Sequence, residues 1–267
     1  MSITRCKILK YEEKWEQIQR FCLFDDEFMT KCFEDNIECT ELVLRIIMEK
    51  PDLIVESVRT QYSIKNLQGR SVRLDILASD SQKKKYNIEI QRDDKGAGVK
   101  RARYNSSLLD ANILDVGENY ENLPETYVIF ITEHDIFGKG KPLYQADRYV
   151  LQTGELLGDG SHIIYVNGEC KDETPIGRLM HDFSCTKAED MHYKVLADRI
   201  RYFKEDKKGV GAMGRVSDEI REEGAREASR EIALGMLKDG KATIEDVVKY
   251  MGLTLEEAKN LAMTINN

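Results

Sequence analysis

The chain has 267 residues, of which 40 are basic and 48 acidic, giving a formal net charge of -8. This balance excludes a protein that coats nucleic acid through its overall charge, so any contact with DNA must come from a local basic patch. The length accommodates one α/β core and a smaller appendage, because single domains typically occupy about 100 to 200 residues. The sequence shows no signal peptide and no apolar stretch long enough to cross a bilayer, so we expect a soluble, cytoplasmic protein.

A helix is predicted over about residues 26–50, where Leu42, Val43, Ile46 and Ile47 recur at helical spacing, and Pro51 ends it. From residue 53 the pattern changes to short stretches rich in Val, Ile and Tyr, which predict strands at about 55–64, 72–78 and 86–91. The links between these strands are turn-like and too short for a crossover helix. The three strands should therefore form an antiparallel meander.

Further along the chain, residues 99–114 are expected to be helical, and the apolar segment 126–132 to be an interior strand. Residues 148–152 and 162–166 are predicted to form an edge hairpin. This order indicates an α/β fold with a mixed β-sheet flanked by helices. From about residue 176 the chain is mainly helical and charged, so we divide it into a domain over 1–185 and a C-terminal helical region over 186–267.

The C-terminal tail is expected to hold two short amphipathic helices. Thr243 followed by Asp246, and Thr254 followed by Glu257, each resemble a helix N-cap. The second of these helices carries few basic residues, so we favour an interaction or homo-oligomerisation element over one that reads bases.

Two acids on neighbouring predicted strands carry the chemistry. Strand alternation places Arg73, Asp75 and Leu77 on one face, and a hairpin centred on Gln82 places Asp75 opposite Glu89. Directly opposed residues have Cβ atoms about 5 Å apart, where two like charges oppose folding unless a cation compensates. Two carboxylates and a main-chain carbonyl are a sufficient protein contribution to a Mg²⁺ site, and such an ion activates water for phosphodiester hydrolysis.

Two other interpretations of these acids stay open. A register shifted by one residue sends one acid to the opposite face of the sheet. Arg73 is also close enough in the predicted hairpin to pair with Glu89 and leave no need for a metal ion.

The segments LDIL and YNIEIQ, joined by a short polar turn, resemble the core of the PD-(D/E)XK nucleases, in particular the Rpn family of transposase-related, recombination-promoting nucleases. The likeness continues through RARYNSSLLDANI, GENYENLPETYVIFIT and the C-terminal tail. It implies a restriction-endonuclease-like fold and magnesium-dependent DNA cleavage in recombination or mobile elements. It also implies that Asp75, Glu89 and the carbonyl of Ile90 hold the metal. Gln91 stands where the superfamily usually has Lys, and an amide orients water without acting as a base.

Other polar residues are secondary candidates. Glu41, on the predicted first helix, either joins the catalytic site or pairs with Arg45 one turn later. Basic residues on both sides of the third strand predict a positive surface beside the acids, with ordinary surface charge as the alternative. They are Lys83 to Lys85, Arg92, Lys95, and the proposed DNA-binding residues Lys100, Arg101 and Arg103.

The cysteines lack metal-binding spacing and are expected to be reduced, and His134, His162, His181 and His192 are not assigned to a metal. The sequence thus predicts a Mg²⁺-dependent endodeoxyribonuclease. The rival hypotheses are a catalytically inactive DNA- or partner-binding remnant of a transposase, and a structural protein assembled through its C-terminal helices.

Overall fold

The computed structural model describes residues 15–66, 69–92, 94–239, 242–251 and 253–265. The chain divides into two compact units, Met1–Val210 and Gly211–Asn267. The domain boundary predicted between residues 185 and 186 stays a prediction. Among the described residues, no helix combines the length and the apolar character needed to cross a membrane.

The first unit is built around a six-stranded sheet. In sheet order its strands are β1 (Val55–Ile64), β2 (Val72–Asp80), β3 (Lys85–Gln91), β4 (Thr126–Thr132), β8 (Ser161–Asn167) and β5 (Leu143–Ala146). The first three form the predicted antiparallel meander, β3, β4 and β8 run parallel, and β5 is antiparallel to β8. The prediction of a mixed sheet is therefore confirmed.

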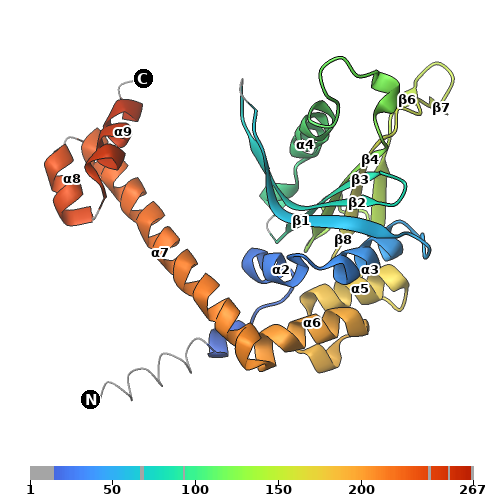
Figure 1. The fold of residues 1–267 in the computed structure, drawn as a ribbon, viewed down its shortest axis with the longest axis horizontal. Helices are drawn as coiled ribbons and strands as arrows, with labels where there is room; N and C mark the ends of the chain where they lie inside the picture. Colours follow the sequence, from blue (N-terminus) through green and yellow to red (C-terminus); the bar gives the residue numbers. More distant parts are fainter. Residues whose placement is uncertain (1–14, 67–68, 93, 240–241, 252, 266–267) are drawn as a thin grey trace. The chain divides into compact units, whose positions relative to one another are not determined.

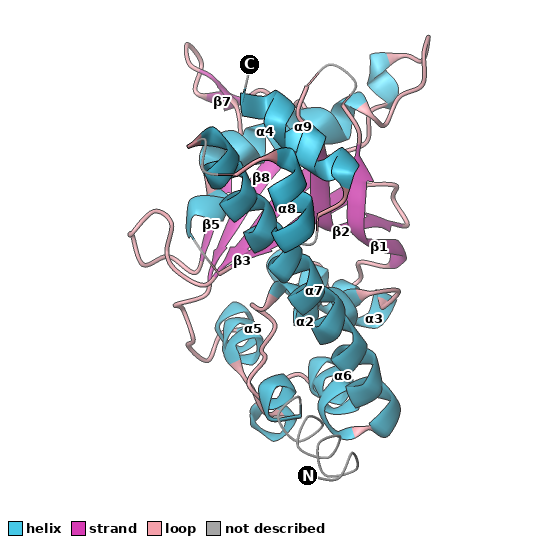
Figure 2. Ribbon diagram, turned by 90° about the vertical axis from the view of Figure 1, so that its left-hand side faces the viewer, coloured by secondary structure: helices cyan, strands magenta, loops and turns pink. Residues whose placement is uncertain are grey.

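Helices cover both faces of this sheet (Figure 1). One face is covered by α4 (Val99–Ala111), and Figure 2 shows the strands separating it from the helices of the other face. Those are α2 (Asp26–Phe33), α3 (Ile37–Ile47), α5 (Pro175–Ser184) and α6 (Lys194–Glu205). Short 3₁₀ turns are η1 (Asp94–Ala97), η2 (Tyr120–Asn122) and η3 (Ala188–Asp190).

The α4 face of the sheet holds the polar residues of β3. Ala102 of α4 packs in one cluster with Val128 and Phe130 of β4. Because Glu89 is in register with Phe130 in the parallel β3–β4 pair, its side chain is on the same face. The neighbouring residues of β3 turn to the opposite, apolar face, where Ile88 is fully buried.

The predicted helix over residues 26–50 is two helices, so that expectation was wrong. Asp35 adopts a φ of 51°, in the left-handed region that ends a helix, and Asn36 then caps α3 by accepting a hydrogen bond from the Cys39 N–H at 3.0 Å. The break lets α2 and α3 take different directions on the sheet.

The predicted edge hairpin was also wrong. The segment near residue 150 instead forms a separate two-stranded sheet of β6 (Tyr149–Val150) and β7 (Glu155–Leu156). The segment 162–166, which was expected to pair with it, lies in β8, an interior strand whose residues from Ile164 to Asn167 are buried. The short strand β5 is the true edge strand.

The second unit contains most of α7 (Lys207–Lys238), together with α8 (Ile244–Met251) and α9 (Leu255–Ile265). Its core is a small cluster of Ala233, Val247, Leu253 and Ala258. The predicted caps are confirmed: Thr243 exchanges hydrogen bonds with Asp246, and Thr254 does the same with Glu257.

Candidate active site

The register of the β2–β3 hairpin is the one that the sequence predicted. Leu77 is opposite Asn87, so the alternative with a one-residue shift was wrong. The regular ladder ends at Ile76 opposite Ile88, one residue before the two acids. Asp75 and Glu89 therefore lie where the two strands stop exchanging backbone hydrogen bonds.

At this position, hydrogen bonds from side chain to main chain join the two strands. The Asp75 N–H donates to Glu89 Oε1 at 3.4 Å, and Asp75 Oδ2 accepts from the Ile90 N–H at 3.0 Å. Each carboxylate is thus bound to the main chain of the opposite strand. The arrangement brings both acids to one place at the end of the ladder.

The other neighbour of β2 is irregular at the same level. Gln61 of β1 has a φ of 51° and falls between the paired positions Thr60–Ile76 and Tyr62–Leu74. Leu74 and Leu77 both contact the cluster beneath α4, although strict alternation would place them on opposite faces. The predicted alternation is therefore interrupted around Asp75, and its carboxylate reaches across to β3.

Burial dominates the electrostatics of the two acids. Asp75 is 9% exposed and Glu89 is 0% exposed, and this desolvation raises the pKa of both carboxyl groups. The neighbouring charge of Asp75 raises the pKa of Glu89 further, while the Arg101 guanidinium opposes both shifts. Two buried acids with raised pKa values form a site that additional positive charge would stabilise.

Arg101 supplies part of that positive charge. Its Nη2 lies 2.6 Å from Glu89 Oε2, and its Nη1 donates to the Gly96 carbonyl at 2.8 Å and to Gln91 Oε1 at 3.4 Å. Arg73 was one expected partner of Glu89, but the partner in the structure, Arg101, comes from α4. This ion pair satisfies one oxygen of Glu89.

A cavity of about 1060 Å³ opens in front of the acids. It brings together six of the residues that the sequence assigned to catalysis, metal binding or DNA binding: Asp75, Ile90, Gln91, Lys100, Arg101 and Arg103. Glu89 is not on its wall, because this side chain is fully buried and bonded to Arg101. The wall also carries Arg70, Arg73 and Arg92, so basic side chains predominate there although the chain as a whole is acidic.

A comparison with known families adds to this geometry. The family model described as PD-(D/E)XK nuclease family transposase matches residues 40–173, half of the chain, including both acids and α4. This chain belongs to that family. No curated protein and no solved structure matched it. The mixed sheet with flanking helices is accordingly a restriction-endonuclease-like α/β fold, and membership supports a nuclease-like, transposase-associated function.

In this PD-(D/E)XK family member, Glu41 does not line the cavity. Its Oε2 accepts from the Val55 N–H at 2.9 Å and its Oε1 pairs with Arg45 at 2.7 Å, which is the i,i+4 pair that the sequence allowed. Asp26, the first residue of α2, lines the cavity instead, and its charge raises the pKa of Asp75. Asp26 was not expected at the site, because α2 and α3 were expected to form one helix.

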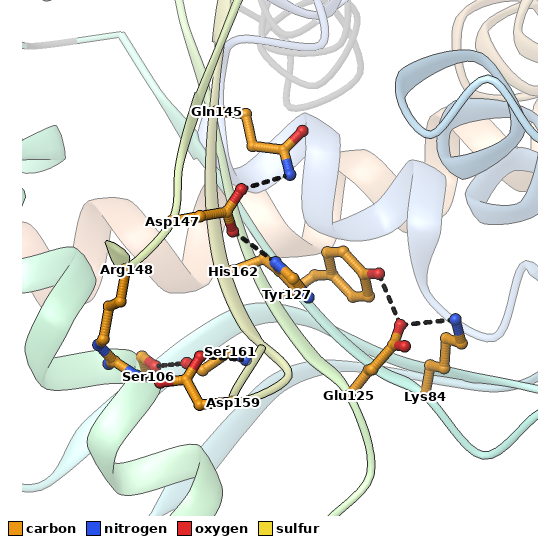
Figure 3. A network of polar contacts seen from close by, with 10 residues as sticks. All are labelled: Lys84, Ser106, Glu125, Tyr127, Gln145, Asp147, Arg148, Asp159, Ser161 and His162. Atoms are coloured by element: carbon orange, nitrogen blue, oxygen red, sulfur yellow. Dashed lines mark hydrogen bonds and ion pairs between the residues drawn. The ribbon is translucent and has the colours of Figure 1, made fainter. Parts of the chain in front are cut away.

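The lysines before β3 lie at the far end of that strand from the acids, so the expectation that they flank the site was wrong. Lys83 pairs with Glu56 at 2.7 Å and Lys84 with Glu125 at 2.6 Å. Figure 3 shows Lys84 and Tyr127 both reaching Glu125, in a network where Asp147 also binds His162. The side chain of Lys95 lies outside the described residues, and Arg92 is engaged by Asp25 and Glu133.

Two further residues shape the site of this family member. At Gly96 an added Cβ would lie 1.8 Å from Gln91 Oε1, so only glycine lets the Gln91 side chain rest where it does. Asn105 of α4 lines the cavity, and its buried Oδ1 has no hydrogen-bond partner in the structure. An unsatisfied oxygen on the wall is a natural contact for water or a hydrated cation.

Proposed function

We propose that this PD-(D/E)XK family member is a metal-dependent endodeoxyribonuclease that hydrolyses phosphodiester bonds during recombination or the movement of mobile elements in the cytoplasm. The observation that carries the proposal is the pair of buried acids at the end of the β2–β3 ladder, of which Asp75 lines a cavity with a basic wall. Family membership supports the nuclease class.

The residues present fit a divalent cation. Asp75 and Glu89 offer carboxylate oxygens, and the Ile90 carbonyl is the proposed third protein contact. An all-oxygen set suits Mg²⁺, which keeps several water ligands of its own. Burial of two acids with one arginine counterion is costly, so a bound cation would be favoured. Such an ion would supply an activated water and neutralise charge on the scissile phosphate.

The other residues of the cavity position the substrate. Lys100 and Arg103 are exposed on α4 and would hold the DNA backbone. We propose that Arg101 leaves Glu89 when a cation arrives, and that its guanidinium then binds a phosphate oxygen. Gln91 would orient the attacking water through its amide, since it has no basic group. Asp26 is a third acid within reach of the cavity.

Two observations favour the rival hypothesis of a catalytically inactive, DNA-binding remnant. Arg101 already occupies one oxygen of Glu89, and Gln91 stands in place of the usual Lys. In that case the basic wall would still bind DNA, and the acids would serve only to hold Arg101 in place. Cleavage and binding therefore have to be measured separately.

The direct test is nicking of supercoiled plasmid by the full-length protein with and without Mg²⁺, comparing wild type with Glu89→Ala. Glu169→Ala is the matched control, because this acid is exposed and, among the described residues, its one ion pair is with His134. We expect cleavage by wild type and the control, only with the metal, and a loss of at least 100-fold in Glu89→Ala. Cleavage that persists without Mg²⁺ or in Glu89→Ala would overturn the proposal. An RNA substrate of equal length tests whether the protein prefers DNA, and we expect it to be left uncut.

The C-terminal unit is proposed as a self-association element. Tyr250 of α8 and Leu255 of α9 are large hydrophobic residues that remain 69% and 52% exposed. Apolar side chains of this size at the surface favour contact with another chain. Leu255→Glu should lower the mass measured by light scattering to that of a single chain, and an unchanged mass would speak against this element.

A further inference from the structure

A second cluster of metal-binding side chains lies at the end of α5. Among the described residues, His181, Asp182 and Cys185 form the one such group of three, and their ligand atoms all lie within 4.8 Å of one another. No histidine was assigned to a metal from the sequence. Cys185, however, follows His181 by four residues, which brings the two side chains to the same side of the helix end.

Two of the distances inside the cluster are close to the spacing of ligand atoms around a tetrahedral ion. Cys185 Sγ lies 3.5 Å from His181 Nδ1 and 3.8 Å from its Nε2, and His181 Nδ1 lies 3.4 Å from Asp182 Oδ1. Zinc binds nitrogen or oxygen at about 2.1 Å and sulfur at about 2.3 Å, which puts neighbouring tetrahedral ligand atoms about 3.4 to 3.6 Å apart. The sulfur is at similar distances from both ring nitrogens, so it lies beside the ring, and the His181 ring has to turn its nitrogen lone pair toward the cluster for an ion to enter.

The carboxylate of Asp182 is already fixed in place. It is fully buried, and its two oxygens accept the N–H groups of His192 and Tyr193, each at 2.8 Å. A carboxylate oxygen that accepts one hydrogen bond retains a lone pair for a metal. Tyr193 is the N-cap residue of α6, so Asp182 ties the end of α5 to the start of α6.

The side chain of His192 lies beside the cluster and is the candidate for a fourth ligand. The imidazole ring of His192 lies 4.7 Å, centroid to centroid, from the ring of His181. His192 is exposed and His181 is partly exposed, so both rings are free to turn and an ion has a path from solvent. None of these residues lines the cavity in front of Asp75 and Glu89.

We propose that His181, Asp182, Cys185 and His192 bind a single transition-metal ion, with Zn²⁺ as the best match. One thiolate, two imidazoles and one carboxylate suit zinc, whereas Mg²⁺ prefers oxygen ligands alone. On binding, the Cys185 thiol gives up its proton to solvent and its sulfur bonds to the metal. The ion joins α5 to α6 across η3, and this structural role is independent of the nuclease proposal.

Cobalt titration of the full-length, reduced protein tests the site, because Co²⁺ takes the tetrahedral positions of Zn²⁺ and a thiolate ligand adds a near-ultraviolet charge-transfer band. The site at Asp75 and Glu89 has no sulfur and gives no such band. We expect one equivalent of Co²⁺ to produce the band, equimolar Zn²⁺ to remove it, and Zn²⁺ to raise the melting temperature by a few degrees.

Cys185→Ser should abolish the band, and His192→Asn should weaken Co²⁺ binding by at least tenfold, even if Cys185→Ser folds poorly. Cys170→Ser and His134→Asn are the matched controls, because these side chains lie outside the cluster, and both should bind as wild type does. The proposal would be overturned if the wild-type protein gave no thiolate band. It would also be overturned if the band survived in Cys185→Ser or disappeared in Cys170→Ser.

Discussion

The Arg101 guanidinium lies 2.6 Å from the Glu89 carboxylate, joining helix α4 to the acid of β3 that is withdrawn from solvent. The same guanidinium contacts the Gly96 carbonyl and Gln91, so it is held on three sides. In the proposed enzyme it occupies a position that a divalent cation also needs. Competition between these two positive charges gives the first prediction.

Arg101→Gln should increase the affinity of the DNA-free protein for Ca²⁺ by about tenfold, because one unit of charge next to the ion is removed. The mutation also raises the pKa of Glu89, but a divalent ion feels the lost charge about twice as strongly as a proton does. Isothermal titration calorimetry measures the change. Arg103→Gln, from the same cavity wall but with no ion pair to either acid among the described contacts, is the control. Unchanged or weaker Ca²⁺ binding in Arg101→Gln would contradict this competition.

DNA binding by Arg101→Gln should change in the opposite direction. If the guanidinium moves to a phosphate, its loss weakens binding to all sequences and lowers the slope of log K against log salt by about 1. Fluorescence anisotropy with a labelled duplex in Ca²⁺ at several salt concentrations gives both quantities. An unaltered salt slope would show that Arg101 stays on Glu89.

Glu89→Gln should stabilise the metal-free protein at alkaline pH. The folded-state pKa of Glu89 is raised, so this carboxyl favours folding below its unfolded pKa and loses that contribution as pH rises through the folded value. The amide does not titrate, so the gain in unfolding free energy should reach about 1 to 3 kcal/mol near pH 9 and vanish near pH 4. Urea denaturation in EDTA measures the unfolding free energies of both proteins. Equal stability of wild type and Glu89→Gln at both pH values would contradict the prediction.

Glu41→Ala should destabilise the protein by about 1 to 3 kcal/mol, because it removes a charged acceptor from the Val55 N–H and the partner of Arg45. Cleavage per folded molecule should be unchanged. Asp26→Asn is expected to show the reverse pattern, with weaker Ca²⁺ binding and little change in stability, since Asp26 is exposed on the cavity wall. A loss of cleavage in folded Glu41→Ala would restore Glu41 as a site residue.

Gly96→Ala should impair cleavage more than stability. The new methyl group would displace the flexible end of Gln91, the proposed water-orienting group, and the backbone of η1 need not move. We expect the rate of plasmid nicking to fall by at least tenfold, with a melting temperature within about 3 °C of wild type. A fully active Gly96→Ala would show that the position of Gln91 does not matter.

The register of the β2–β3 hairpin was predictable because a short turn fixes it, and this register brings Asp75 and Glu89 to the same end of the ladder. The interior strand β4 was predictable from its continuous apolar sequence. Both features depend on residues that are close together along the chain.

The contacts of the site that the sequence did not reveal are produced by tertiary packing. Arg101 reaches Glu89 because α4 docks on one face of the sheet, which no local pattern specifies. Asp26 replaces Glu41 at the cavity because the left-handed Asp35 splits one expected helix into two. Strand β8 was mistaken for an edge strand, because its burial depends on β5, which pairs with it from across a long loop.

Calorimetric titration of Ca²⁺ into the wild-type protein, Asp75→Asn and Glu89→Gln tests the central claim most directly, because it measures the ion itself without relying on DNA or turnover. Two carboxylates that share one hard cation should give one Ca²⁺ per chain in the wild type, and each substitution should abolish that binding while Glu169→Gln preserves it. Equal Ca²⁺ binding by all four proteins would contradict the account and leave Arg101 as the only cation that these acids hold.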